Sequence, residues 1–141
     1  MKLGIALVAL VALALMLFKL QARLSSATTG AEFAGIDWRP TSIASESVPD
    51  DTDQFVRFEV DGSISGHGGC NRFFGALKSV DGGIEVGPLG ATRMACPEPI
   101  MSREAAFLAA VQKTRSFDFG KERLRLLDEN GDELVTLVPR G

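Results

Sequence analysis

The chain has 141 residues and a formal net charge of −3 at pH 7, from 15 basic and 18 acidic residues. This length suits a single domain with a short additional segment. All 18 acidic residues follow position 27 but only 12 of the basic residues do, so the later part carries a net charge of −6. Nucleic acid is bound through clustered lysines and arginines, and an acidic domain lacks that charge. We therefore expect no nucleic-acid partner.

The chain begins with an apolar segment. Residues 3–18, "LGIALVALVALALMLF", form an uninterrupted run of 16 residues without a charge, and Lys19 and Arg23 follow it. This pattern predicts a secretory signal peptide or a membrane anchor, which must be set apart from the folded domain. A helix of this length spans about 24 Å, less than the roughly 30 Å hydrocarbon core of a bilayer. Leu20 and a snorkelling Lys19 would extend the span to residues 3–20.

Two fates of this segment remain open. The small residues "SSA" at 25–27 favour cleavage after Ala27, whereas the charges of Lys19 and Arg23 are unusual between an apolar run and a cleavage site. Either fate predicts export, as a periplasmic protein after cleavage or as an inner-membrane protein with its domain outside the cytoplasm. The expected parts of the chain are the signal or anchor at 1–27, a linker at 28–36 and the domain at 37–141.

Alternating polar and apolar residues predict several short strands in the domain. The expected strands, in chain order, are a short one that opens at Trp38, then 55–60, 63–68, 73–80, 84–89, 116–119 and the two halves of 123–138. Pro40 restricts the first segment to an edge of the sheet or to a strand end, because proline has no amide hydrogen for a neighbouring strand. Asn130-Gly131 predicts a type I′ turn in the last hairpin, with positive φ at both residues.

One helix is expected within the domain. Residues 102–114, "SREAAFLAAVQKT", contain strong helix formers, with Ser102 as the N-cap, Glu104 in the first turn and Phe107 on the apolar face. Short antiparallel strands joined by tight turns tend to curl, which protects their edges. The sequence therefore predicts a mainly β (α+β) fold. This fold is a curved, barrel-like antiparallel sheet of seven or eight strands with one packed helix, preceded by the N-terminal hydrophobic helix.

The chemistry available to the chain is narrow, because it has two cysteines, Cys70 and Cys96, and one histidine, His67. A structural zinc site needs four ligands in paired spacing, so these three residues are too few. A nucleophile needs a histidine base and a third group that orients it, and His67 lies too near Cys70 in the sequence to face it easily. We therefore expect His67 to face solvent, and we expect no metal, no cofactor and no catalytic residue.

The remaining interpretation of the two cysteines is a disulfide. An exported chain enters an oxidising compartment, where one pair of cysteines is the minimum set for such a bond. Cys70 and Cys96 are 26 positions apart. In the chain-entropy model, closing a loop of that length stabilises a domain by roughly 3–4 kcal/mol.

Two phrases around the cysteines resemble the META domain, the HslJ-like family of bacterial heat-shock proteins. The first phrase is "GGCNRFFG" and the second is "ATRMACPEP", which is followed by a glutamate-bearing helix. The matching residues are Trp38, Gly69, Cys70, Asn71, Gly75, Thr92, Arg93, Met94, Ala95, Cys96, Pro97, Glu104 and Phe107. Leu77 departs from the family pattern, in which tyrosine is common at that place.

The resemblance carries several implications. It implies an antiparallel, barrel-like sheet with a helix packed on it, a bond between Cys70 and Cys96, and a location in the cell envelope. It also implies an association with stress and, in some members, with drug tolerance or virulence. It implies no catalytic residues, because the family has none established.

We therefore expect a non-enzymatic envelope protein that binds a partner or supports envelope integrity under stress. The expected binding surface comprises Asn71, Arg72 and Arg93, because these two arginines are the basic groups nearest the disulfide. An anionic group of an envelope protein or of a small ligand could dock there; alternatively, Arg93 pairs with a carboxylate of the chain itself. Two other hypotheses are a small-ligand carrier, which needs a cavity lined with Phe and Leu in the barrel mouth, and an unrecognised hydrolase.

Overall fold

The computed structural model describes residues 2–25 and 30–141 of the chain. They belong to two compact units, residues 1–32 and Phe33–Gly141. The first unit contains helix α1 (Lys2–Ser25), whose side chains at 7–18 are all exposed. None of the described helices combines the length and the mean hydropathy of a membrane span. The predicted cleavage after Ala27 lies outside the described residues.

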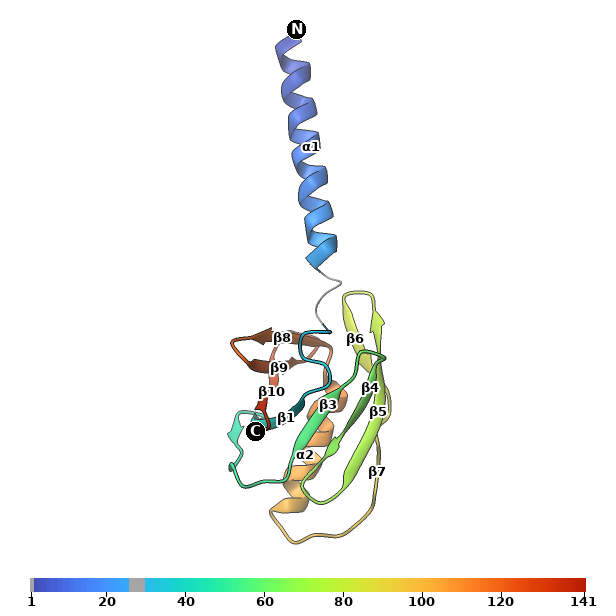
Figure 1. The fold of residues 1–141 in the computed structure, drawn as a ribbon, viewed down its shortest axis with the longest axis vertical. Coiled ribbons are helices and arrows are strands. Elements are labelled where there is room, and N and C mark those ends of the chain that lie inside the picture. The colour runs from blue at the N-terminus through green and yellow to red at the C-terminus, as the bar shows by residue number, and fades with distance from the viewer. Residues whose placement is uncertain (1, 26–29) are drawn as a thin grey trace. The chain divides into compact units, whose positions relative to one another are not determined.

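The second unit is a ten-stranded antiparallel sheet with one helix packed on it (Figure 1). The strand order is β6-β5-β4-β3-β1-β10-β9-β8, with β2 beside β1 and β7 beside β5. In chain order the elements are β1 (Asp37–Ile43), β2 (Glu46–Ser47), β3 (Phe55–Phe58), β4 (Ser63–His67), β5 (Arg72–Val80), β6 (Gly83–Val86), β7 (Gly90–Ala91), α2 (Ile100–Lys113), β8 (Ser116–Gly120), β9 (Arg123–Leu127) and β10 (Glu133–Pro139). The predicted mainly β fold is confirmed. The two additional strands, β2 and β7, have two residues each, too few to show an alternating pattern.

The sheet curves like a barrel but does not close. Strands β6 and β8 are its two ends, and no strand ladder pairs them within the part of the domain that the structure describes. A backbone hydrogen bond nevertheless joins the two ends, from the amide of Ile84 to the carbonyl oxygen of Arg115 at 2.8 Å. We refer to this junction, Ile84 with Arg115, as the seam.

The core lies between the concave face of the sheet and helix α2. The helix packs against β10, β1 and β6, and its buried apolar residues are Phe107, Ala110 and Val111. Phe107 meets Phe73 of β5 edge-on, with the ring centroids 5.9 Å apart. The largest inward side chains of the other strands are Trp38, Val56, Phe58, Ile64, Leu124, Leu126, Val135 and Leu137, all at most 2% exposed.

Helix α2 begins at Ile100, two residues before the predicted start, so Ser102 is not its N-cap. Pro99 occupies the N-cap position and makes no side-chain capping bond. The carboxylate of Glu98 instead accepts a hydrogen bond from the Ser102 amide at 3.1 Å. Pro97 and Pro99 directly precede the helix. Proline is compatible with a helix start, where an amide hydrogen would have no helical partner.

The domain begins before residue 37, because Phe33 belongs to its core. Phe33 is 2% exposed, and its ring centroid lies 6.0, 4.9 and 6.0 Å from those of Phe58, Phe117 and Phe119. Its carbonyl oxygen accepts a 2.9 Å hydrogen bond from the indole of Trp38. The prediction of a linker over 28–36 is therefore wrong at its C-terminal end, where a single aromatic residue gave no periodic signal.

Strand β1 is central in the sheet and Pro40 lies in its middle, although Pro40 predicted an edge or a strand end. The strand pairs with β10 over most of its length and with β3 through Asp37 and Trp38. Its register against β10 shifts between Pro40 and Ser42, and its pairing with β3 ends before Pro40. Proline is tolerated at such irregularities, because the regular ladder is already interrupted there.

The last hairpin has a three-residue loop in place of the predicted type I′ turn. Gly131 has a φ of 82°, but Asn130 is not among the residues with positive φ. The Gly131 amide donates to the carbonyl of Asp128 at 3.1 Å, and the Asp128 amide donates to the carbonyl of Asp132 at 2.9 Å. This is the pattern of a type I turn followed by one left-handed residue. The Asp128 carboxylate accepts the amides of Asn130 and Asp132 at 2.8 and 3.0 Å, and so closes the turn from within.

Replacing Gly131 with alanine is expected to lower the free energy of unfolding by about 1 kcal/mol. A Cβ at Gly131 would meet no heavy atom within 4 Å, so the cost is the strain of its positive φ alone. Gly120→Ala is the matched control, because a Cβ there also has open space and the φ of Gly120 is not positive. Urea denaturation measures both variants, and equal stability of the two would contradict this account of the turn.

Candidate functional site

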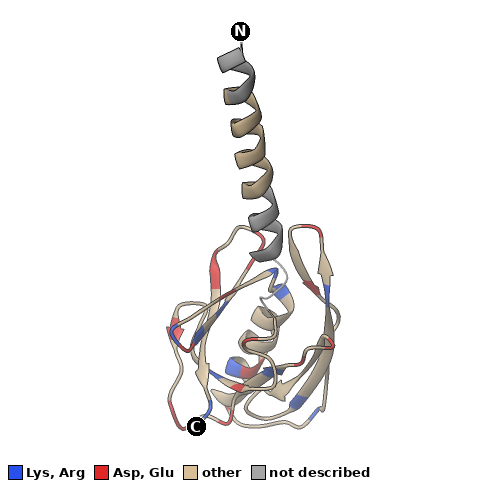
Figure 2. Cartoon of the chain, turned by 45° about the horizontal axis from the view of Figure 1, so that its top comes forward, with Lys and Arg blue, Asp and Glu red and all other residues tan. Residues whose placement is uncertain are grey.

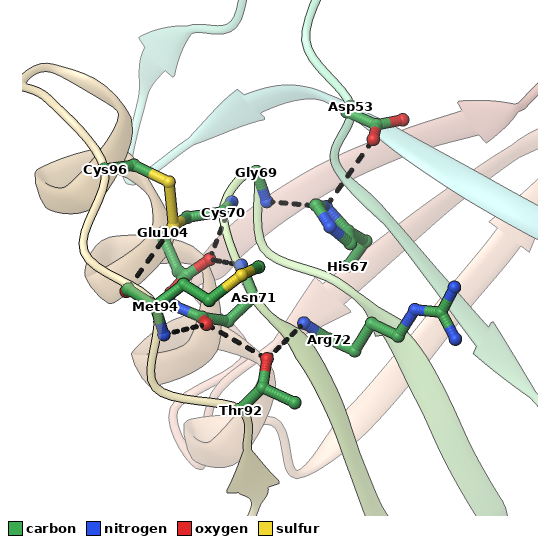
Figure 3. The surroundings of a disulfide bond; sticks show 10 residues. All are labelled: Asp53, His67, Gly69, Cys70, Asn71, Arg72, Thr92, Met94, Cys96 and Glu104. Carbon is green, nitrogen blue, oxygen red and sulfur yellow. Dashed lines mark hydrogen bonds and ion pairs between the residues drawn. A yellow bond between two sulfur atoms is a disulfide. The ribbon is translucent and has the colours of Figure 1, made fainter.

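A disulfide joins Cys70, at the connection between β4 and β5, to Cys96, in the loop before α2 (Figure 3). The two Cα atoms lie 6.0 Å apart. Cys70 is 3% exposed and Cys96 is half-buried. The bond therefore ties the loop that contains Cys96 directly to the sheet.

The side chain of Asn71 holds the same loop to the sheet by hydrogen bonds (Figure 3). Its Oδ1 accepts the amide of Met94 at 2.6 Å, and its Nδ2 donates to the carbonyl oxygen of Met94 at 3.1 Å. The hydroxyl of Thr92 also donates to Oδ1, at 3.0 Å. The carboxamide thus takes the place of a neighbouring strand's peptide group. Asn71 is 3% exposed, so it does not lie on the predicted binding surface and has a structural role instead.

The carboxylate of Glu104, on helix α2, lies beneath this connection (Figure 3). Its Oε2 accepts the amides of Cys70 and Asn71 at 2.9 and 2.6 Å, and its Oε1 accepts Nδ2 of Asn71 at 2.7 Å. Glu104 is 6% exposed. The sequence predicted only a favourable position near the helix start. Its spacing from Phe107 and Val111 places it on the apolar face, and a glutamate on such a face is the signal that could have indicated a buried role.

The environment of Glu104 keeps its carboxylate ionised. Burial by itself raises the pKa of Glu104, but the hydrogen bonds from the side chain and amide of Asn71 and from the amide of Cys70, together with the charge of nearby His67, outweigh burial and lower the pKa. Gly68 allows this close approach. A Cβ at Gly68 would lie 2.5 Å from Cγ of Glu104, so no larger residue fits without moving the carboxylate.

Glu104 is expected to make the stability of the domain depend on acid pH. Because its folded pKa is below the ordinary value of 4.5, the unfolded chain takes up this proton first as the pH falls. The stabilisation is therefore fully present above the ordinary pKa and is lost as the pH falls through the folded pKa. Urea denaturation at a series of pH values below about 5 gives the free energy of unfolding at each pH. As the pH falls, this free energy should decrease less steeply for Glu104→Gln than for the unsubstituted protein. The exposed Glu129→Gln is the control, and parallel curves for all three proteins would contradict the assignment.

His67 does not face solvent as predicted. Its side chain is 18% exposed, and its Nδ1 accepts a 3.2 Å hydrogen bond from the amide of Gly69. The same nitrogen lies 3.8 Å from a carboxylate oxygen of Asp53. Strand β4 ends at the partly buried His67, and the proximity of Asp53, 14 positions away in the sequence, was not visible in the strand pattern.

Arg72 and Arg93 lie on two segments that are joined by hydrogen bonds. The Arg72 amide donates to the hydroxyl of Thr92 at 3.2 Å, and the Thr92 amide donates to the carbonyl of Arg72 at 3.0 Å. Acidic and basic residues are interspersed over the domain (Figure 2). Within residues 30–141, however, neither guanidinium has an ion pair within 4.0 Å. The alternative in which Arg93 pairs with a carboxylate is thus not found in this part of the chain.

Two exposed apolar side chains accompany these arginines. Phe74 follows Arg72 on the same face of β5 and is 60% exposed, and Met94 is adjacent to Arg93 and is 58% exposed. We refer to Arg72, Phe74, Arg93 and Met94 as the arginine surface. Its cations and apolar groups are carried by backbone that Asn71, Glu104 and the disulfide hold in place.

A separate cavity of about 300 Å³ lies between the segment before β3, the turn after β4 and the start of α2. Its lining residues are Asp51, Thr52, Asp53, Gln54, Gly68, Gly69, Ile100 and Arg103, and we refer to it as the Gln54 cavity. Ile100 is the one large apolar side chain among them. It is therefore not the Phe- and Leu-lined cavity that a carrier with a ligand in the barrel mouth needs.

The fold and the site together define a small antiparallel β domain in which a disulfide and a buried Asn71–Glu104 pair fix one loop against the sheet. The chain belongs to the META domain family, whose model matches residues 31–140. No curated protein matches its sequence.

Solved structures share this fold. An NMR structure of a protein from Burkholderia xenovorans is 25% identical, with a TM-score of 0.57 over 79% of this chain and 86% of its own. Another NMR structure is 22% identical, with a TM-score of 0.61 over 79% of this chain and 94% of its own. A crystal structure of a DUF4847 family protein from Bacteroides vulgatus is 15% identical, with a TM-score of 0.52 over 75% of this chain and 93% of its own. The last two likenesses concern the fold alone.

Proposed function

We propose that this META domain protein is a non-enzymatic protein of the cell envelope that binds an envelope protein through the arginine surface and so supports envelope integrity under stress. The observation that carries the proposal is the exposure of Arg72 and Arg93 without ion pairs, in a part of the chain whose net charge is −6. Arginine and aromatic side chains together are the composition of interface hot spots.

The rigidity of the backbone supports the same proposal. The disulfide and the two backbone bonds of Asn71 to Met94 hold the segment that carries Arg93 and Met94 in one conformation. A surface that is already ordered loses little conformational entropy when a partner binds. An anionic group of the partner would contact the arginines, and an apolar group would cover Phe74 and Met94.

Site-specific crosslinking in cells tests this surface. A photoreactive amino acid in place of Phe74 should give a crosslinked product in the envelope, and Arg72→Glu with Arg93→Glu should abolish it. Val60, which is 81% exposed on a different loop, is the matched control position. Crosslinking that is equal at both positions, or that survives the two charge reversals, would contradict partner binding at this site.

Export is supported by the apolar run at 3–18 and by the disulfide, which is stable in an oxidising compartment. N-terminal sequencing of the protein from cell fractions tests it. A start at Thr28 in the soluble periplasm would identify a signal peptide, and Met1 retained in carbonate-washed membranes would identify an anchor. Met1 retained in a cytosolic fraction would contradict export.

A further inference from the structure

The Gln54 cavity is distinct from the arginine surface and has a different chemical character. Three segments far apart in the sequence meet there: residues 51–54, the turn Gly68–Gly69, and the first turn of α2 with Ile100 and Arg103. Its volume of about 300 Å³ lies at the lower end of the range for small-molecule sites. The cavity therefore fits a molecule of few heavy atoms.

Opposite charges line this cavity without neutralising each other. Asp53 is bound by Arg140, with a nitrogen–oxygen distance of 2.6 Å. Asp51 and Arg103, in contrast, form no ion pair within 4.0 Å in the region from residue 30 to residue 141. Asp51 is exposed at the rim, whereas Arg103 is half-buried. One carboxylate and one guanidinium are thus left for a molecule that carries both charges.

Gln54 is the fully buried residue of the cavity lining. The residue is 1% exposed, and its Nε2 donates to the carbonyl oxygen of Gly68 at 2.9 Å, which fixes the orientation of the carboxamide. Its Oε1 is buried and has no hydrogen-bond partner among the described residues. Less than 1 Å² of Oε1 is accessible, so Gln54 forms part of the cavity wall and Oε1 is not a contact for a molecule in the cavity.

We propose that the Gln54 cavity binds a small zwitterion of the α-amino acid class, either a free amino acid or a dipeptide. The ligand's ammonium group donates to the carboxylate of Asp51, and its carboxylate accepts from the guanidinium of Arg103. Ile100 supplies the apolar contact for the side chain. Charge-assisted hydrogen bonds at both ends give the ligand its orientation, and a molecule with only one of the two charges leaves Asp51 or Arg103 unpaired.

NMR titration of the isotope-labelled full chain, with its disulfide intact, tests the proposal. The probes are the standard α-amino acids and dialanine at millimolar concentration. We expect saturable shifts of the amide signals of Gly68 and Gly69 and of the Gln54 carboxamide with at least one probe. The N-acetylated and the C-amidated forms of that probe should produce no saturable shift, because each lacks one charge.

Variants then assign the contacts. Asp51→Asn and Arg103→Gln should each weaken binding of the same probe by about tenfold or more, which corresponds to at least 1.4 kcal/mol. Asp50→Asn is the matched control, because Asp50 is a neighbouring exposed carboxylate that pairs with Arg39 and does not line the cavity. The absence of a saturable shift with every probe would overturn the proposal. Equal binding of the capped probes, or unchanged binding after both substitutions, would also overturn it.

Discussion

Replacing Glu104 with alanine is expected to lower the free energy of unfolding by about 3–5 kcal/mol. The substitution leaves the amides of Cys70 and Asn71 and one Nδ2 hydrogen of Asn71 without their acceptor. All three groups are buried, so the loss of each charge-assisted hydrogen bond is costly. The loss also frees the side chain of Asn71, and with it the loop around Met94.

Urea denaturation of the full chain measures this effect, and two further variants define its cause. Glu104→Gln keeps the shape but presents an NH₂ group to hydrogen-bond donors, so it should lose about 2–3 kcal/mol. Glu129→Gln, on the exposed last hairpin, should lose less than about 0.5 kcal/mol. If Glu104→Gln were as stable as the unsubstituted protein, the carboxylate would not be the acceptor that fixes this connection.

Removing the disulfide is the second large effect. The double variant Cys70→Ser with Cys96→Ser is expected to lose about 3–4 kcal/mol, because the bond closes a loop between residues that are 26 positions apart. Without it the unfolded chain gains conformational entropy. The folded chain also loses the covalent link between the β4–β5 connection and the loop before α2.

Mass spectrometry without reductant should first show Cys70 linked to Cys96 in the purified protein. Unfolding of the unsubstituted protein in excess reductant should then reproduce the loss measured for the double variant. A loss in the variant but none on reduction would assign the effect to the serine hydroxyls in a buried site. Two free thiols in protein purified from the envelope would contradict the bond itself.

Much of the sheet could be predicted from the sequence because its strands alternate. Strands β3, β4, β5, β9 and β10 each have an inward apolar row, and the turns between them contain glycine or asparagine. The turns with positive φ were harder to predict from the sequence. Both residues of Lys121-Glu122 and of Ala44-Ser45 have positive φ, the backbone required for type I′ turns. Neither pair has the Asn-Gly composition that favours them, whereas the Asn-Gly pair forms a different turn. Strand pairing outweighed local preference at these places.

The sequence predicted the candidate site only at residues whose type allows few roles. Two cysteines with one histidine in the whole chain have few uses, so their pairing could be predicted from the sequence. Asn71, in contrast, could equally have been a surface residue, because it is polar and stands beside the charged Arg72. Its burial depends on Glu104, which is 33 positions away, and the charge of Glu104 depends in turn on three donors that the fold brings to it. Such reciprocal contacts arise from tertiary structure and leave no local pattern.

The seam has a consequence for the motions of the domain. Every neighbouring pair along the strand order is held by a ladder, whereas β6 and β8 meet through the bond from Ile84 to Arg115. Separating the two ends therefore breaks few backbone hydrogen bonds, and such openings lie at the low-energy end of a protein's local unfolding. We expect the amide hydrogen of Ile84 to exchange with solvent deuterium well before those of Val56 and Leu137 in the middle of the sheet. Local opening of this domain is therefore expected where β6 meets β8, at the two ends of the strand order. It is not expected at the centre of the order, between β3 and β1, where Trp38 is buried.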